Sequence, residues 1–150
     1  MSEPEPIAQS LPPLLIALAS ELVHAIDTGV RDRGFTDLRP AHGFAFARLA
    51  PGGATVNELA VHLGVTKQAA SQMVDDLVRK GYVERHPHPS DARAKLIVLT
   101  DLGWECTRAT EAAAADAVRP WATTLGRRRL RELHEDLNLL APVGQLRPAW

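Results

Sequence analysis

The centre of the sequence carries the capping and turn signals of two helices joined by a single glycine, and no other feature restricts the fold as strongly. Thr55 and Glu58 have the spacing of a capping box, which predicts a helix that begins just after Thr55. Gly64 suits the left-handed position that ends a helix. Thr66 can then cap a second helix, which is expected to stop at Gly81. The chain is therefore expected to turn sharply between two helices.

A strand pair is expected directly after the second helix. Residues 82–86 and Lys95–Leu99 are predicted as strands, and residues 87–93 between them are rich in turn formers. Helix, glycine turn, helix and hairpin in this order predict a winged helix-turn-helix. The expected fold class is thus mainly α with a small β-hairpin wing, in which a winged helix-turn-helix lobe is joined to helical dimerisation arms.

The second central helix has an apolar inner face and a polar outer face. In a helix-turn-helix, the N-terminal part of this helix reaches deepest into the major groove of DNA. Base readout is therefore assigned to Lys67, Gln68, Ser71 and Gln72, whose side chains can bond to base edges. Asp75 and Asp76 would repel phosphate, so they are expected to point away from the DNA backbone or to orient a neighbouring cation. A merely solvated helix face is the alternative, which the two caps, the turn and the hairpin together disfavour.

The charge distribution is compatible with DNA although the whole chain carries a net charge of −1. Residues 66–95 hold six Lys and Arg residues against four acids, a net charge of +2 in the segment assigned to DNA contact. Affinity for DNA depends on where the cations lie rather than on the total charge.

The flanking segments show apolar residues at helical spacing. Helices are predicted from residue 12 to about 33, from about 40 to 49, from 101 to about 118 and from about 126 to 141, and Pro120 is expected to kink or end the third of them. The predicted division of the chain is a flexible tail at 1–10, a helical dimerisation region at 11–38 and 101–150 that ends in an irregular tail, and a winged helix-turn-helix DNA-binding lobe at 39–100.

These flanking helices predict a dimer. An isolated N-terminal helix and an isolated leucine-rich C-terminal helix cannot bury their apolar stripes alone, whereas pairing with a second copy buries both. Such pairing would also set two recognition helices about 34–36 Å apart, which is one turn of DNA.

Residues 55–103 resemble the DNA-binding lobe of the MarR family of bacterial transcriptional regulators. The matching residues are Glu58-Leu59-Ala60, Leu63-Gly64-Val65, Leu77, Lys80-Gly81-Tyr82-Val83-Glu84-Arg85, Asp91-Ala92-Arg93-Ala94-Lys95, Leu99-Thr100 and Gly103. The resemblance implies a homodimer in which the terminal helices of both subunits intertwine. It also implies a DNA-binding wing of Asp91, Arg93 and Lys95, in which Arg93 reaches the minor groove and Asp91 braces it.

The resemblance further implies a small-molecule pocket where the dimerisation arm meets the winged lobe. For Trp104, packing in the core is the more ordinary role. The residues proposed to line the pocket are His24, Asp27, His42, Phe46, Trp104 and Arg108. Both the identity and the existence of an effector stay open at this point.

The wing departs from the family pattern at His86-Pro87-His88-Pro89. If the two histidines face phosphate, their protonation below about pH 6.5 would strengthen DNA binding. The alternative is that the prolines shape the tip and the histidines are solvated. Two histidines do not complete a zinc site, so a metal is not expected there.

The remaining features exclude several classes of protein. Cys106 is the only cysteine, so an intrachain disulfide and a cysteine-cluster zinc site are excluded, and a partly buried, inert thiol is expected. No catalytic motif occurs, so neither an enzyme nor a cofactor is expected. No apolar run approaches the ~18 residues of a membrane span, and the acidic, proline-rich N-terminus does not resemble a secretory leader. The expected compartment is the cytoplasm.

Together these features predict a sequence-specific DNA-binding transcriptional regulator. It would act as a homodimer on a pseudo-palindromic operator, as repressor or activator, with release by a small-molecule ligand left open. The alternative is a helical dimeric module that binds protein and not DNA.

Overall fold

The computed structural model describes residues 6–141 and is mainly helical, with one antiparallel hairpin in that range. This confirms the fold class expected from the sequence. In chain order the elements are α1 (Pro6–Asp32), α2 (Pro40–Leu49), α3 (Val56–Leu63), α4 (Lys67–Arg79), β1 (Val83–Pro87), β2 (Lys95–Leu99), α5 (Asp101–Leu125) and α6 (Arg127–Leu140).

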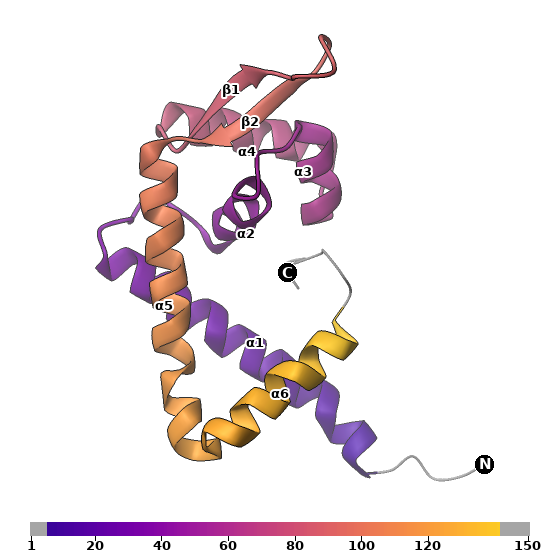
Figure 1. Cartoon of the computed structure of the whole chain (residues 1–150), viewed down its shortest axis with the longest axis vertical. Coiled ribbons are helices and arrows are strands. Elements are labelled where there is room, and N and C mark those ends of the chain that lie inside the picture. The colour runs from indigo at the N-terminus through magenta and orange to yellow at the C-terminus, as the bar shows by residue number, and fades with distance from the viewer. Residues whose placement is uncertain (1–5, 142–150) are drawn as a thin grey trace, which may run out of the picture.

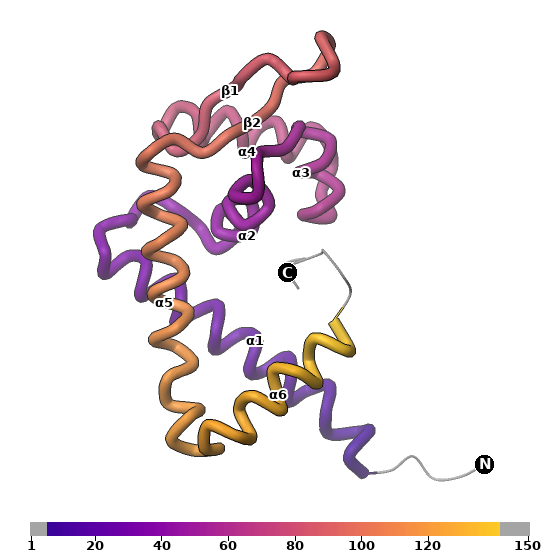
Figure 2. The backbone as a smooth tube through the Cα atoms, viewed as in Figure 1, coloured from indigo at the N-terminus to yellow at the C-terminus, as the bar shows by residue number. Residues whose placement is uncertain are grey.

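The long helix α5 connects a lobe at one end with an arm at the other (Figure 1). The lobe holds α2, α3, α4 and the hairpin, and the arm holds α1 and α6. The smooth trace in Figure 2 shows how the chain passes from α1 into the lobe and returns to the arm along α5. Helix α1 packs closely on α5 at Gly29, which has no side chain. A Cβ atom added there would lie only 2.8 Å from the Cβ of Ala113. The contact is extended by an ion pair between Arg33 and Asp116 at 2.7 Å.

The helix-turn-helix forms with the predicted caps. Thr55 Oγ1 accepts the backbone N–H of Glu58 at 3.2 Å, and the Glu58 carboxylate accepts the N–H of Thr55 at 2.8 Å. Gly64 ends α3 with φ +66°, a conformation that favours glycine. Thr66 Oγ1 accepts the N–H of Ala69 at 3.1 Å, which caps α4.

The wing hairpin pairs Val83 with Leu99 at one end and Pro87 with Lys95 at the other. Its first strand begins one residue later than predicted, because the N–H of Tyr82 donates to the carbonyl of Leu77 at the end of α4. Ala54 also exchanges two backbone hydrogen bonds with Ile97 of β2, at 3.1 and 2.8 Å. The N-terminus of α3 is thereby held beside the wing.

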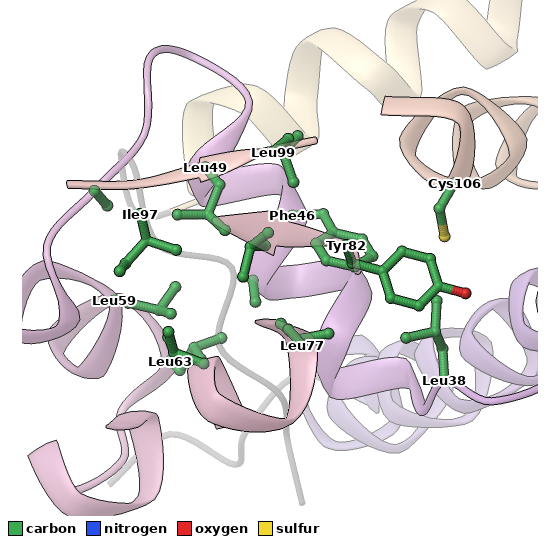
Figure 3. Packing of buried hydrophobic residues seen from close by; sticks show 14 of the residues in the cluster. Leu38, Phe46, Leu49, Leu59, Leu63, Leu77, Tyr82, Ile97, Leu99 and Cys106 are labelled. Carbon is green, nitrogen blue, oxygen red and sulfur yellow. The ribbon is translucent and has the colours of Figure 1, made fainter. Parts of the chain in front are cut away.

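A single apolar core fills the lobe and supports all of its elements (Figure 3). Leu59 and Leu63 of α3, Leu77 of α4 and Ile97 of β2 are almost completely buried in it. The ring of Tyr82 lies 5.7 Å from that of Phe46, centroid to centroid, at the side of the core nearest α5. Helix α4, the predicted recognition helix, is therefore supported along its inner face by this core.

Two expected boundaries were wrong. Residues 6–10, expected as flexible, form the start of α1, which continues through Pro12 and Pro13; residues 1–5 and 142–150 lie outside the described part. Helix α5 continues through Pro120 to Leu125. A proline removes one backbone donor, and the helix persists where neighbouring turns keep their bonds. Here α5 ends instead at Gly126, whose φ of +79° leaves the helical region.

The arm leaves much of its apolar surface uncovered in the single chain. Val30 is the only buried residue of α1, and α6 has none. Ile16 is 65% exposed and Leu139 85% exposed. By length and composition alone α1 could also cross a membrane, contrary to the expectation that no apolar segment is long enough. This is weak evidence for a span, since a helix that pairs with another subunit has the same composition.

Candidate nucleic-acid interface

A concave surface of about 390 Å³ lies between the N-termini of α3 and α4 and the wing. It brings together Lys67 and Ser71 of the recognition helix with the three predicted wing residues. Four of its residues are cationic and one is acidic, so the surface favours a polyanion. The lining residues are Thr55, Val56, Asn57, Lys67, Ser71, Arg85, Asp91, Arg93, Ala94, Lys95 and Ile97.

The recognition helix presents its predicted polar residues outward. Lys67, Gln68 and Gln72 are exposed and Ser71 is half-buried. The opposite face of α4 packs into the core through Ala70, Val74 and Leu77, all of which are completely buried. Gln68 and Gln72 lie outside the concave surface, on the adjoining exposed face of the helix.

The wing is braced through its backbone. The carboxylate of Asp91 accepts the backbone N–H of Arg93 at 2.9 Å, and the Asp91 carbonyl accepts the N–H of Ala94 at 3.2 Å. Among residues 6–141, the Arg93 guanidinium forms no ion pair. Asp91 thus shapes the turn and leaves the Arg93 side chain available.

The two wing histidines have different environments. Nδ1 of half-buried His88 accepts the backbone N–H groups of Ser90 and Asp91, at 3.2 and 3.1 Å. His86 Nε2 lies 2.8 Å from a carboxylate oxygen of Glu84. His88 is therefore part of the turn that holds Asp91. This structural role differs from both expectations, a solvated histidine and one that faces phosphate.

Three polar residues of the concave surface were not selected as DNA contacts from the sequence. Thr55 and Asn57 join it because the Ala54–Ile97 pairing draws the start of α3 to the wing. Arg85 of β1 is held by an ion pair with Asp75 of α4. The alternating pattern of the strand could have placed Arg85 on an outer face, but only the packing of β1 on α4 shows which one.

A second group of polar residues lies on the flank of α4. Lys80 Nζ binds the Asp76 carboxylate at 2.9 Å and the carbonyl oxygen of Asp37 at 2.6 Å. The hydrogen bond from Lys80 holds the pKa of Asp76 below its usual value. Tyr82 Oη donates to the Asp37 carboxylate at 2.8 Å, and burial together with this acceptor raises the pKa of the phenol. As expected, Asp75 and Asp76 each orient a neighbouring cation.

The residues proposed for an effector pocket are not gathered at one site. A cavity of about 40 Å³ between arm and lobe includes Asp27 and Phe46 but none of the other four. His42 is completely buried on α2, whereas His24, Trp104 and Arg108 are exposed on α1 and α5. A cavity of this size holds about one water molecule rather than an organic ligand. The sequence could not foresee this, because helical spacing does not reveal which faces of α1, α2 and α5 meet.

Cys106 also lines this small cavity and is buried, with 1% of its surface exposed. Burial raises the pKa of its thiol to about 11, so it is protonated at neutral pH and a poor nucleophile. Among the described residues, no group of three His, Cys, Asp or Glu side chains could hold a metal ion.

Comparison with known proteins agrees with this geometry. A model described as "MarR family" matches residues 37–94. No curated protein matches the chain. Among solved structures, the transcriptional regulator Tm0710 from Thermotoga maritima is 25% identical, with a TM-score of 0.66, over 88% of this chain and 92% of that one.

Two structures of MarR from E. coli have the same fold. The wild-type apo form is 23% identical with a TM-score of 0.71, and a mutant complexed with operator DNA is 22% identical with a TM-score of 0.70. Both alignments cover 93% of this chain and 100% of the other. The chain therefore matches a MarR-family model over its lobe and shares the fold of these transcriptional regulators along almost its whole length.

Proposed function

We propose that this protein is a transcriptional regulator that binds DNA as a homodimer on a pseudo-palindromic operator. The observation that most directly supports this proposal is the concave cationic surface between α4 and the wing. Lys67, Gln68, Ser71 and Gln72 would read bases in the major groove, and the wing of Asp91, Arg93 and Lys95 would lie along the adjacent minor groove. The mutant MarR structure with operator DNA supports this assignment by its shared fold.

The proposed dimer is supported by the uncovered apolar surface of the arm. A groove of about 360 Å³ lies between α1, α5 and α6, lined by Leu18, Trp121, Thr124, Leu125 and Leu133. Contiguous exposed apolar residues of this kind mark sites of association with another protein surface. We assign the dimerisation region to α1, α5 and α6 and the DNA-binding lobe to residues 39–100.

The proposal places the protein with DNA in the cytoplasm. Release by a small molecule stays a prediction, and it requires the cavity of about 40 Å³ between arm and lobe to open in another conformation.

Selection of bound duplexes from a random pool tests the function and yields the operator. The double variant Arg93→Ala, Gln68→Ala should lose operator binding without change in dimerisation. Arg119→Ala is the control for removal of a cation, because Arg119 is an exposed residue of α5 that pairs with Asp116 and does not line the concave surface. Binding by the double variant as tight as that of the wild type would refute the assignment of this face.

The salt dependence gives a second test. A dimer that makes about 6–10 phosphate contacts should lose roughly 10³–10⁵-fold in affinity between about 50 and 200 mM salt. A flat response would contradict the geometry.

A further inference from the structure

His42 carries a buried donor that the fold leaves unsatisfied. Its side chain is completely buried on the first turn of α2. Nδ1 accepts the backbone N–H of Arg39 at 2.9 Å, so the proton of the neutral ring is on Nε2. Nε2 has no hydrogen-bond partner in the described part of the chain. An orphaned buried donor of this kind calls for an explanation, since it keeps its full cost of desolvation.

The group that faces this donor belongs to the recognition helix. An oxygen of the Asp76 carboxylate lies 3.9 Å from His42 Nε2, which is about 1 Å too long for a hydrogen bond. Burial is the main cause that lowers the pKa of His42, to about 4, so the ring is neutral and the two residues form no ion pair near pH 7. The donor and a carboxylate acceptor are thus present but too far apart to form a hydrogen bond.

The Asp76 carboxylate also takes part in a set of polar contacts between α4 and the segment that joins the arm to the lobe. We call this set of contacts the strap. Lys80 connects Asp76 to the carbonyl of Asp37, and Tyr82 binds the Asp37 carboxylate. Residues 37–42 are therefore tied to the C-terminal end of the recognition helix.

We propose that His42 and Asp76 are positioning residues for DNA binding, which join when α4 shifts by about 1 Å toward α2 in the DNA-bound protein. The inference rests on the proposed function. The closed arrangement gains a hydrogen bond to a carboxylate that the free chain lacks, so DNA that selects this arrangement binds more tightly. The strap then transmits the position of the arm to the angle at which α4 meets the groove.

Two substitutions of His42 separate its two nitrogen atoms. His42→Asn keeps an acceptor close to the position of Nδ1 and removes the donor, whereas His42→Gln places an amide donor near the position of Nε2. We expect His42→Asn to weaken binding to the selected duplexes by about tenfold or more, which corresponds to about 1.4 kcal/mol. His42→Gln should restore part of that loss. Both proteins should remain dimeric.

A double-mutant cycle with Asp76→Asn tests the pair itself. Asp76 is partly exposed, so this variant should fold even if a change at the buried position 42 does not. We expect the effects of His42→Asn and Asp76→Asn on DNA affinity to be non-additive by about fourfold or more. Arg79→Gln is the control, since it breaks the exposed ion pair of Arg79 with Asp76 and leaves both the strap and the carboxylate oxygen that faces His42 in place.

Duplexes whose half-sites are moved apart or together by one base pair provide a readout that loss of stability alone would not change. The variants should alter the preference for spacing as well as the affinity. Additive effects with unchanged spacing preference would overturn the inference and leave the function standing. Failure of the wild type to bind any duplex would instead refute the proposed function.

Discussion

Acidification should destabilise this protein well above the pH at which its carboxylates titrate, and His42 is the reason. Burial holds the folded-state pKa of His42 near 4, against 6.5 for a solvated histidine. The charges of Arg39 and Lys80 lower the pKa further, and those of Asp76 and Asp37 oppose them. Below pH 6.5 His42 of the unfolded chain therefore binds a proton that His42 of the folded chain does not bind until the pH approaches 4.

The size of the effect follows from the difference between the two pKa values. Between the folded and unfolded pKa values, the free energy of unfolding falls by up to about 1.4 kcal/mol for each pH unit of acidification. From pH 7 to pH 5 the loss attributable to His42 is about 2 kcal/mol. The contribution of this group is complete above pH 6.5 and is lost as the pH falls toward 4.

Urea-induced unfolding at pH 7, 6 and 5, followed by circular dichroism, measures this dependence. The protein concentration is held constant, because dimerisation contributes to apparent stability. The variant His42→Asn lacks the titrating group and should show a shallower dependence on pH. Equal free energies of unfolding for the wild type at pH 7 and pH 5, or parallel curves for wild type and variant, would refute the reasoning.

Two further substitutions test packing and the wing. Gly103→Ala should destabilise the protein by about 2 kcal/mol in thermal or urea unfolding, because the new Cβ would lie 2.2 Å from the carbonyl oxygen of Tyr82. Gly43→Ala is its control: no heavy atom lies within 4 Å of that Cβ, so higher helix propensity should leave stability equal or raise it by up to about 1 kcal/mol. For the wing, His88→Ala should weaken operator binding by about three- to tenfold through loss of the acceptor for two backbone N–H groups, and His88→Asn should retain most of the affinity. Equal affinities for these two His88 variants in a fluorescence anisotropy titration would contradict the proposed role of Nδ1.

Local signals predicted the lobe well because its boundaries are set by short-range chemistry. The caps at Thr55 and Thr66 and the left-handed turn at Gly64 involve atoms a few residues apart, so their residue types suffice to predict them. The outward position of Lys67 and Gln72 follows from helix periodicity in the same way. The arm was less predictable, since α1 begins before Pro12 and α5 continues through Pro120, a residue that by local rules favours a kink or a helix end.

The sequence by itself determined the order of the elements, the turn between α3 and α4 and the polar side of the recognition helix, since all of these depend on neighbours along the chain. Only the tertiary structure decided that Arg85 joins the concave surface and that the six proposed pocket residues are scattered. It also decided that His42 faces Asp76 across a gap. These contacts join residues distant in sequence, and their geometry depends on how closely whole helices approach one another, which no local pattern records.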